Sequence, residues 1–364
     1  MYESDNRVVM TLDAGGTNFV FSAIKGYASI VPSVCLPSVP NNLKKCMSVL
    51  VDGFRKIKNS LTEDPIAISF AFPGPADYEH GIIGDLPNFP AFRGGIALGP
   101  FLKEEFGIPV FINNDGNLFA YGEALAGVLP QINHELEIAG NPKRYKNLLG
   151  ITLGTGFGAG VVINNSLLTG DNGCGGDIWL MRNKKYPDML AEESVSIRAI
   201  NRVYNELTGE STYSLTPKDV FDIAEGIHPG NRNAAIQSFN ELGEMAGAAI
   251  INALNIIDGI VVIGGGLSGA YKYILPAMIH EMKRSISTFA GLNFNCLQSE
   301  VYNLMNENDH SLFLMNKRSD VKIPFTDKYA IYDRFKKTGI IISKLGANKA
   351  IALGAYAYAL SQLD

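Results

Sequence analysis

Two stretches of this sequence place glycine and threonine between apolar segments, at positions where backbone groups could bind an anion. Residues 11–24 read "TLDAGGTNFVFSAI", and residues 150–164 read "GITLGTGFGAGVVIN". Glycine packs poorly inside a strand, so these clusters predict tight hairpin turns. The N–H groups of such a turn can face a phosphate. Taken alone, either stretch could equally be a plain turn between paired strands.

The second turn fits neither of the two common nucleotide-binding loops. A Walker loop ends in Gly-Lys-Ser or Gly-Lys-Thr, and residues 150–164 contain no lysine. A dinucleotide-binding loop leads into a helix, whereas Val161, Val162 and Ile163 are β-branched and predict a strand. A hairpin is therefore the remaining interpretation.

The two turns form an internal repeat, in which Thr11-Leu12 corresponds to Thr152-Leu153 about 140 residues later. Such a repeat predicts two related lobes. The first turn alone carries a carboxylate, Asp13. Because a phosphate site needs a carboxylate to hold its metal ion, this asymmetry favours a working nucleotide site.

A second carboxylate, Asp115, follows an apolar strand in "INNDGN" at residues 112–117. At this place it could accept the proton of a hydroxyl that attacks a phosphoryl group. Asn and Asp are also ordinary N-cap residues before a helix, so a structural role remains open. In the same way, Gly264, Gly265 and Gly266 could contact a nucleotide or simply turn the chain from strand to helix.

Composition bounds the class of protein. A chain of 364 residues suits two domains, and its net charge of −5 gives no case for nucleic acid or an anionic membrane. No apolar run is long enough to span a bilayer, and the start lacks the features of a signal peptide. The four cysteines are far apart, which predicts reduced thiols in a cytoplasmic protein.

The patterning predicts an α/β protein with a small lobe of residues 1–112 plus the C-terminal helix 347–364, and a large lobe of residues 113–346. Residues 296–339 are polar and look like an irregular insertion. Apolar spacing predicts helices over residues 41–58, 98–106, 117–126, 233–255 and 348–360.

Taken in order, the motifs resemble the actin-like ATPase superfamily, and most closely the ROK family of sugar kinases and regulators. The similar segments are "LDAGGTN", "PGPAD" with "GIIGDLPNFPAF", "INNDGNLFAYGEALAG", "ITLGTGFGAGVVIN" and "DGIVVIGGG". They cover nearly the whole chain. The resemblance implies two actin-like (RNase H-like) lobes with an interlobe cleft.

The resemblance also implies an ATP-dependent kinase that phosphorylates a hydroxyl of a hexose or N-acylhexosamine, in a homo-oligomer (dimer or tetramer). It implies that Asp13 organises Mg²⁺, through water, and that Asp115 is the catalytic base. The implied ATP-binding and phosphate-binding residues are Asp13, Gly15, Gly16, Thr17, Gly154, Thr155, Gly156, Gly158, Gly264, Gly265 and Gly266. The implied sugar-binding residues are Asn88, Asn114, Asp115, Asp177 and Glu192.

One segment departs from the family, whose Gly-Glu-Ile-Gly-His motif precedes a cysteine-rich zinc loop. Here residues 175–200 read "GGDIWLMRNKKYPDMLAEESVSIRAI". Asp177 takes the place of the glutamate and Leu180 that of the histidine, so we expect no structural zinc. Glu192 matches a later glutamate, with Glu193 as a one-residue alternative, and Asp177 could be only a solvated loop carboxylate.

With no zinc, something else must hold this loop. We expect a small apolar core made by Trp179, Leu180, Met181, Met189 and Leu190. The alternative is that Trp179 packs at a surface or a subunit contact.

Two other functions compete with the kinase. A regulator of the same family needs a DNA-binding helix-turn-helix before its first lobe, and here the first strand begins by about Val8. A non-catalytic sugar-binding member would have no need for both Asp13 and Asp115, so their presence together favours the enzyme.

Overall fold

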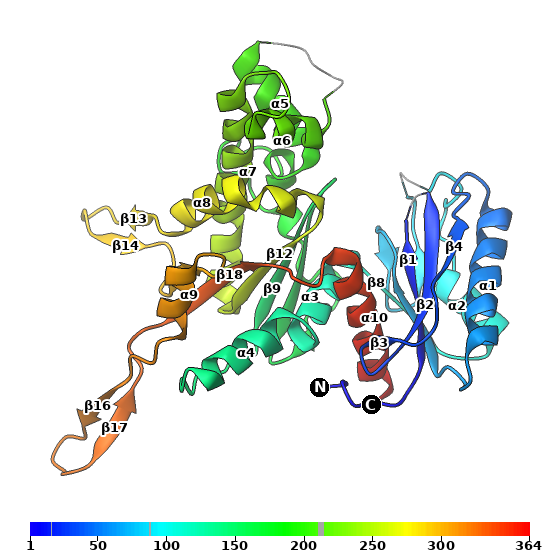
Figure 1. Cartoon of the computed structure of the whole chain (residues 1–364), viewed down its shortest axis with the longest axis horizontal. Coiled ribbons are helices and arrows are strands. Elements are labelled where there is room, and N and C mark those ends of the chain that lie inside the picture. Colours follow the sequence, from blue (N-terminus) through cyan, green and yellow to red (C-terminus); the bar gives the residue numbers. More distant parts are fainter. Residues whose placement is uncertain (16, 87–88, 210–214) are drawn as a thin grey trace. The chain divides into compact units, whose positions relative to one another are not determined.

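The computed structural model describes residues 1–15, 17–86, 89–209 and 215–364 and has a mixed α/β fold (Figure 1). It divides into two compact units. The first unit comprises Met1–Pro130, Gly160–Gly176 and Lys344–Asp364, and the second comprises Gln131–Ala159 and Asp177–Ser343. The lobe limits expected from the sequence remain a prediction.

A sheet in the order β3-β2-β1-β5-β8, with β4 beside β2, forms the centre of the first unit. Its strands are β1 (Val9–Ala14), β2 (Asn18–Lys25), β3 (Ala28–Ser29), β4 (Val34–Pro37), β5 (Ala67–Ala71) and β8 (Val110–Asn113). Strands β1, β5 and β8 are parallel, whereas β1 and β2 form the antiparallel hairpin predicted at the first glycine turn. The short strands β6 (Ala76–Asp77) and β7 (Ile82–Ile83) form a separate hairpin.

Helices cover both faces of this sheet because neighbouring residues of a strand point to opposite sides. Met10 lies in a cluster with Phe54 of α1 (Leu43–Ser60), and the next residue back, Val9, lies in a cluster with Tyr356 of α10 (Ala347–Leu363). The remaining helices of this unit are α2 (Leu98–Phe106) and α3 (Asp115–Leu125), and α4 (Val128–Ile138) crosses the division between the units.

Helix α10 approaches α3 so closely that glycine is required on both helices. A Cβ added at Gly354 would lie 1.8 Å from the carbonyl oxygen of Leu118, and one at Gly122 would lie 1.9 Å from that of Ala350. Both obstacles are backbone atoms, which cannot turn aside as a flexible side chain can. The position of α3, which begins at Asp115, therefore depends on α10.

Parallel strands also form the centre of the second unit. The sheet has the order β11-β10-β9-β12-β18-β15, in which β9, β12, β18 and β15 are parallel to one another. The bounds are β9 (Leu148–Leu153), β10 (Phe157–Ile163), β11 (Ser166–Leu167), β12 (Ile260–Gly264), β15 (Glu300–Asn303) and β18 (Lys337–Ile342). Strand β10 begins in the second unit and ends in the first.

The second unit has one long helix, α7 (Arg232–Ile257), in which Gly243 allows α8 (Tyr271–Met282) to approach. A Cβ at Gly243 would lie 2.3 Å from the carbonyl oxygen of Ile274. This unit also contains α5 (Ile197–Thr208), α6 (Pro217–Glu225), and the 3₁₀ helices η1 (Ile178–Leu180), η2 (Ala191–Ser194) and η3 (Gly266–Ala270). Among the helices that the structure describes, none is long and apolar enough to cross a membrane.

The expectation that residues 296–339 are irregular was wrong, whereas their being an insertion stays a prediction. Strand β15 pairs with β18 in the main sheet, and α9 (Glu307–Leu314) buries Phe313 beside it. Only part of this segment is peripheral, namely the exposed hairpin of β16 (Ser319–Lys322) and β17 (Tyr329–Tyr332). A second exposed hairpin joins β13 (Ser285–Ser287) to β14 (Asn293–Asn295).

Candidate active site

The first glycine turn joins β1 to β2 and begins with Asp13. It is tight, because the Gly15 N–H donates to the Asn18 carbonyl oxygen at 3.0 Å and a Cβ at Gly15 would lie 2.8 Å from that oxygen. The side chains of Asp13 and Thr17 are exposed, and Gly16 lies outside the described residues. Partial desolvation raises the pKa of Asp13 above its ordinary value. A cation next to this carboxylate would offset that cost.

Asp115 is the first residue of α3 and follows the buried end of β8. Asn114 is the N-cap: its Oδ1 accepts from the Gly116 N–H at 2.7 Å, and Asp115 Oδ1 accepts from the same N–H at 2.8 Å. The Asp115 side chain is exposed, as a group that meets a substrate must be. The protein around it still desolvates the carboxyl group and raises its pKa, and the Gly116 N–H opposes that shift.

Two buried amides lie on either side of this turn. Asn117 Nδ2 donates to Asn113 Oδ1 at 3.0 Å, and that oxygen also accepts from the Asn114 N–H at 2.8 Å. Asn113 and Asn117 are 1% and 4% exposed. Their pairing ties the end of β8 to the first turn of α3, and so fixes the backbone that carries Asp115.

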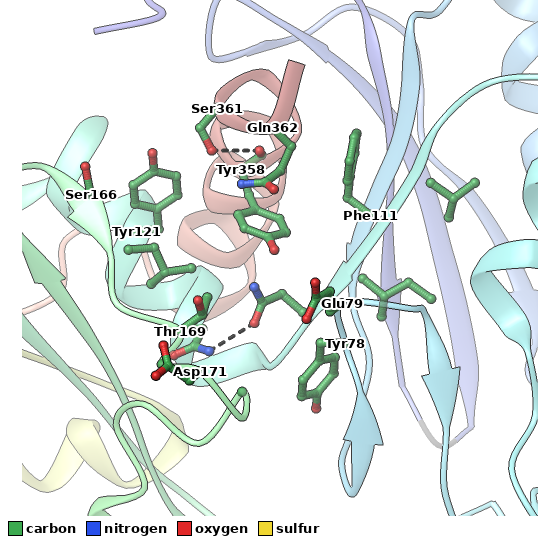
Figure 2. A pocket seen from close by; sticks show the side chains of 17 residues that line it. Tyr78, Glu79, Phe111, Tyr121, Ser166, Thr169, Asp171, Tyr358, Ser361 and Gln362 are labelled. Atoms are coloured by element: carbon green, nitrogen blue, oxygen red, sulfur yellow. Dashed lines mark hydrogen bonds between the residues drawn. The ribbon is translucent and has the colours of Figure 1, made fainter. Parts of the chain in front are cut away.

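A cavity of about 550 Å³ in the first unit adjoins Asn113 and Asn117 (Figure 2). Figure 2 shows Glu79, Tyr121 and Tyr358 around it, and Asp171 also lines it. None of the predicted site residues that the structure describes lines this cavity. Among the described residues of its wall there is no lysine or arginine, so its two carboxylates make it unsuited to a phosphate.

The second glycine turn, between β9 and β10, lies against Glu192. The Phe157 N–H donates to Glu192 Oε2 at 3.1 Å, and a Cβ at Gly156 would lie 2.6 Å from the same oxygen. Glycine at 156 therefore leaves the room that the carboxylate occupies. A backbone hydrogen bond inside the turn also stabilises it, because the Gly154 N–H donates to the Gly156 carbonyl oxygen at 3.1 Å.

The sequence placed Gly156 in a phosphate loop and Glu192 at a sugar, and the structure brings them into contact. Arg198 lies 3.2 Å from Glu192 Oε1 and 3.3 Å from Glu193 Oε1. Gly158 is needed as well, because a Cβ there would lie 2.3 Å from Thr152 Oγ1. Thr155 is exposed at the tip of the turn.

The triplet Gly264–Gly266 lies at the end of β12, beside the second turn. Gly265 has a φ of +87°, and a Cβ there would lie 2.3 Å from the Leu153 carbonyl oxygen. This position requires glycine for its conformation and for its close approach to β9. Gly266 faces open space, and it lines an apolar cavity of about 280 Å³.

Sequence reasoning missed the other walls of this apolar cavity. They come from α6, α7 and η3, and the residues are Pro217, Lys218, Phe221, Phe239, Leu267, Gly269 and Ala270. The rings of Phe221 and Phe239 meet edge to face with centroids 6.2 Å apart. No local pattern in the sequence joins these three elements, because only the packing of α6 on α7 brings them to Gly266.

Asp177 is exposed at the start of η1, and Asn88 lies outside the described residues. The expected apolar core around Trp179 was wrong. Leu180, Met189 and Leu190 are 52%, 55% and 37% exposed. The buried side chains of this segment include the amide of Asn183, which is 2% exposed, together with Ile178, Ala191 and Ser194.

The predicted residues that the structure describes thus fall into two groups, one in each unit. The first unit carries Asp13, Gly15, Thr17, Asn114 and Asp115. The second unit brings the 154–158 turn, Glu192 and the Gly264–Gly266 triplet together. Within the described parts of the chain, no group of three or more His, Cys, Asp and Glu side chains is arranged to hold a metal ion.

Known proteins resemble this chain over most of its length. A glucokinase from Parabacteroides distasonis ATCC 8503, whose crystal structure is solved, is 60% identical, with 99% of each chain covered and a TM-score of 0.89. A glucokinase from Thermotoga maritima is 28% identical over 74% of this chain and 88% of its own. A xylose repressor from Bacillus spizizenii is 25% identical over 70% of this chain and 62% of its own.

The structural likeness confirms the predicted fold class, an α/β protein of the actin-like ATPase type. Residues 9–300 match the sequence model of the ROK family. Since that match spans most of the 364 residues and follows the order of the motifs, this chain belongs to the ROK family.

Proposed function

We propose that this protein is an ATP-dependent sugar kinase that transfers the γ-phosphoryl group to a hydroxyl of a hexose or N-acylhexosamine. The observation that carries the proposal is the Asp115 carboxylate, which is exposed at the N-terminus of α3 with a raised pKa. A sugar hydroxyl is a poor nucleophile, so its proton must be removed as it attacks. The glucokinases among the relatives support the same reaction.

Asp115 acts as the base in this proposal. Desolvation makes its carboxylate more basic than an ordinary aspartate, and that favours proton transfer from the hydroxyl. Asn114 uses Oδ1 for the N-cap, so its amide nitrogen is the group that donates to a sugar hydroxyl. The other proposed sugar contacts are Asn88, Asp177 and Glu192.

The phosphates are proposed to bind at the two glycine turns, through backbone N–H groups other than those of Gly15 and Gly154, which donate to carbonyl oxygens within the turns. The proposed contacts are Gly15, Gly16 and Thr17 in the first turn and Gly154, Thr155, Gly156 and Gly158 in the second. Asp13 fits Mg²⁺, because it is an exposed hard-oxygen ligand, and Mg²⁺ commonly takes one or two carboxylates with waters and phosphate oxygens. When bound, the ion would neutralise charge on the phosphate oxygens.

The apolar cavity at Gly266 is proposed to hold the adenine. A flat, largely apolar ring system can pack against aromatic side chains such as Phe221 and Phe239. Gly265 and Gly266 allow the chain to pass close to the nucleotide, because the open space at Gly266 would be filled by any larger side chain. Lys218 also lines this cavity, and its ammonium group is paired with the Asp222 carboxylate.

A non-catalytic sugar-binding protein or a sugar-responsive regulator is the alternative, since a xylose repressor is among the relatives. Purified protein assayed for ADP release with hexoses, N-acetylhexosamines and ketoses separates the two. We expect turnover that depends strictly on one class of sugar. Sugar binding without ADP release, for every sugar, would contradict the kinase and favour the alternative.

Replacing Phe221 with alanine is expected to raise the KM for ATP about fivefold and to leave the KM for sugar unchanged. The variant removes one aromatic wall of the proposed adenine pocket, and such contacts are worth about 1 kcal/mol. Steady-state kinetics with each substrate varied in turn measure the effect. Ile227→Ala is the control, because Ile227 is 72% exposed and lies just beyond α6. An equal change in both KM values would place the nucleotide elsewhere.

A further inference from the structure

The segment from Met181 to Ser194 folds around one buried amide, that of Asn183. Asn183 is 2% exposed although its neighbours Lys184 and Lys185 are exposed. A polar side chain is buried at little cost only when its hydrogen-bonding groups find partners. Its partners therefore indicate what the burial achieves.

Asn183 bonds to both sides of the loop that it begins. Its Nδ2 donates to the Leu190 carbonyl oxygen at 3.1 Å and lies 2.8 Å from Ser194 Oγ. Its Oδ1 accepts from the N–H groups of Lys185 and Tyr186, each at 3.0 Å. All the donor and acceptor capacity of the side chain is used, so the amide has one orientation.

These bonds hold both ends of the short helix η2. Leu190 is the N-cap of η2 and Ser194 is its last residue, and Glu192 lies between them. A backbone bond from the Ala191 N–H to the Met181 carbonyl oxygen, at 2.8 Å, adds a third tie. The carboxylate of Glu192 then reaches the Phe157 N–H of the second glycine turn.

Two ion-pair groups hold the loop on the rest of the unit. Lys184 lies 2.7 Å from Glu244 and from Glu281, and Lys185 lies 2.8 Å from Glu241. The side chains of Glu241 and Glu281 are only 11% and 8% exposed, so these pairs are anchored in the helices α7 and α8. Asn183 thus connects the stretch that is anchored on α7 and α8 to η2, the helix that carries Glu192.

We infer that Asn183 is a positioning residue for the acceptor sugar, because it sets the place of Glu192 through Leu190 and Ser194. This inference rests on the proposed function, in which Glu192 contacts the sugar. Asn183 itself touches neither substrate in this scheme. Its loss should therefore weaken sugar binding more than nucleotide binding, although Glu192 also accepts from the Phe157 N–H of the second glycine turn.

Asn183→Asp tests the link with a side chain of the same size. The carboxylate keeps the bonds from Lys185 and Tyr186, and the Ser194 hydroxyl can turn to donate to it. It cannot donate to the Leu190 carbonyl oxygen, and two acceptors then face each other. We expect the dissociation constant for glucose, or for N-acetylglucosamine if that is the substrate, to rise about tenfold without ATP. The KM for ATP should stay within about twofold.

Asn141→Asp is the matched control. Asn141 is also buried, donates to the Leu314 carbonyl oxygen at 3.0 Å and accepts from the Lys143 N–H at 3.0 Å, and neither partner belongs to the segment that carries Glu192. The control variant should lose stability in a similar way and bind sugar normally. Ser194→Ala provides a second, milder variant of the same link, with an expected effect of about threefold in the same direction.

A double-mutant cycle with Glu192→Gln separates positioning from general damage. If Asn183 acts through Glu192, adding Asn183→Asp to the Glu192→Gln protein should weaken sugar binding by less than about twofold more. Independent, multiplied effects would overturn the inference, as would equal sugar binding by wild type and Asn183→Asp. Failure of the proposed function would look different, because the wild type itself would then release no ADP with any sugar.

The fluorescence of Trp179, the only tryptophan of the chain, provides a measurement that does not depend on catalysis. It lies in η1, four residues before Asn183, and is half-buried. Asn183→Asp should shift its emission maximum, and Asn141→Asp should not. Unchanged emission together with unchanged sugar affinity would mean that the segment is held without this amide.

Discussion

Asp115→Asn is expected to lower sugar-dependent ADP release by about 10²- to 10⁴-fold, the range that a positioned general base contributes. The amide keeps the shape of the carboxylate and can still accept the Gly116 N–H, but it cannot take a proton from the sugar hydroxyl. Sugar affinity should fall only a few-fold. A coupled assay at saturating ATP and sugar measures the loss, and turnover within a few-fold of wild type would contradict the assignment of Asp115 as base.

The Asp115→Asn variant could also lose activity because it unfolds. A measurement of its unfolding temperature tests this explanation. Since the folded state raises the pKa of Asp115, it binds that proton more tightly than the unfolded chain does. The contribution of this group to the free energy of unfolding is then present at low pH and is lost as pH rises through the folded pKa. The amide that replaces the carboxylate is neutral at pH 7, so the variant should unfold at the same temperature as wild type or higher.

The same shift predicts the acid limb of the wild-type activity. Asp115 must be ionised to act as a base, so kcat/KM should fall as pH drops through its raised pKa. The midpoint is expected above the ordinary range of aspartate. A pH profile of kcat/KM for sugar gives the midpoint, and activity that persists undiminished down to the ordinary aspartate range would contradict it.

Gly354→Ala is expected to destabilise the first unit by about 3 kcal/mol, at the upper end of what overpacking costs. The added methyl would lie 1.8 Å from the Leu118 carbonyl oxygen, so α10 and α3 must move apart. Differential scanning calorimetry measures the shift in the unfolding temperature. Because α3 begins at Asp115, we also expect a lower kcat in the protein that remains folded.

Gly269→Ala is the control for this substitution. Gly269 lies in η3, and a Cβ there meets nothing within 4 Å. Its unfolding temperature should match wild type. If Gly354→Ala also unfolds like wild type, the close approach of α3 and α10 does not govern the stability of the unit.

Much of the fold could be predicted because its signals are local. The helix predicted at 348–360 is α10 (Ala347–Leu363), and the one predicted at 98–106 is α2. The first glycine turn is a hairpin, as the apolar strands on either side of "DAGGTN" indicated. Each of these elements shows its apolar spacing or turn residues within a single stretch of sequence.

The parts that were missed depend on contacts between distant residues. Strand β15 belongs to the main sheet, at its edge, only because it pairs with β18. No pattern within residues 296–339 reveals that partner. The segment after Asp177 contains enough apolar side chains to suggest a core, yet Leu180, Met189 and Leu190 are exposed while the Asn183 amide is buried. The neighbouring Lys185 pairs with Glu241 of α7. A buried amide has no sequence signature, because asparagine is common in loops.

The dependence of the first unit on α10 has a consequence for synthesis of the protein. Val9 and Ala67 lie in the cluster that Tyr356 and Leu360 complete, and α10 begins 280 residues after Ala67. At a translation rate of about 5–20 residues per second, that face of the sheet stays uncovered for roughly 15–55 s after its strands are made. During this time the whole second unit emerges from the ribosome. A nascent chain of this protein therefore presents apolar surface to chaperones and proteases until α10 is released.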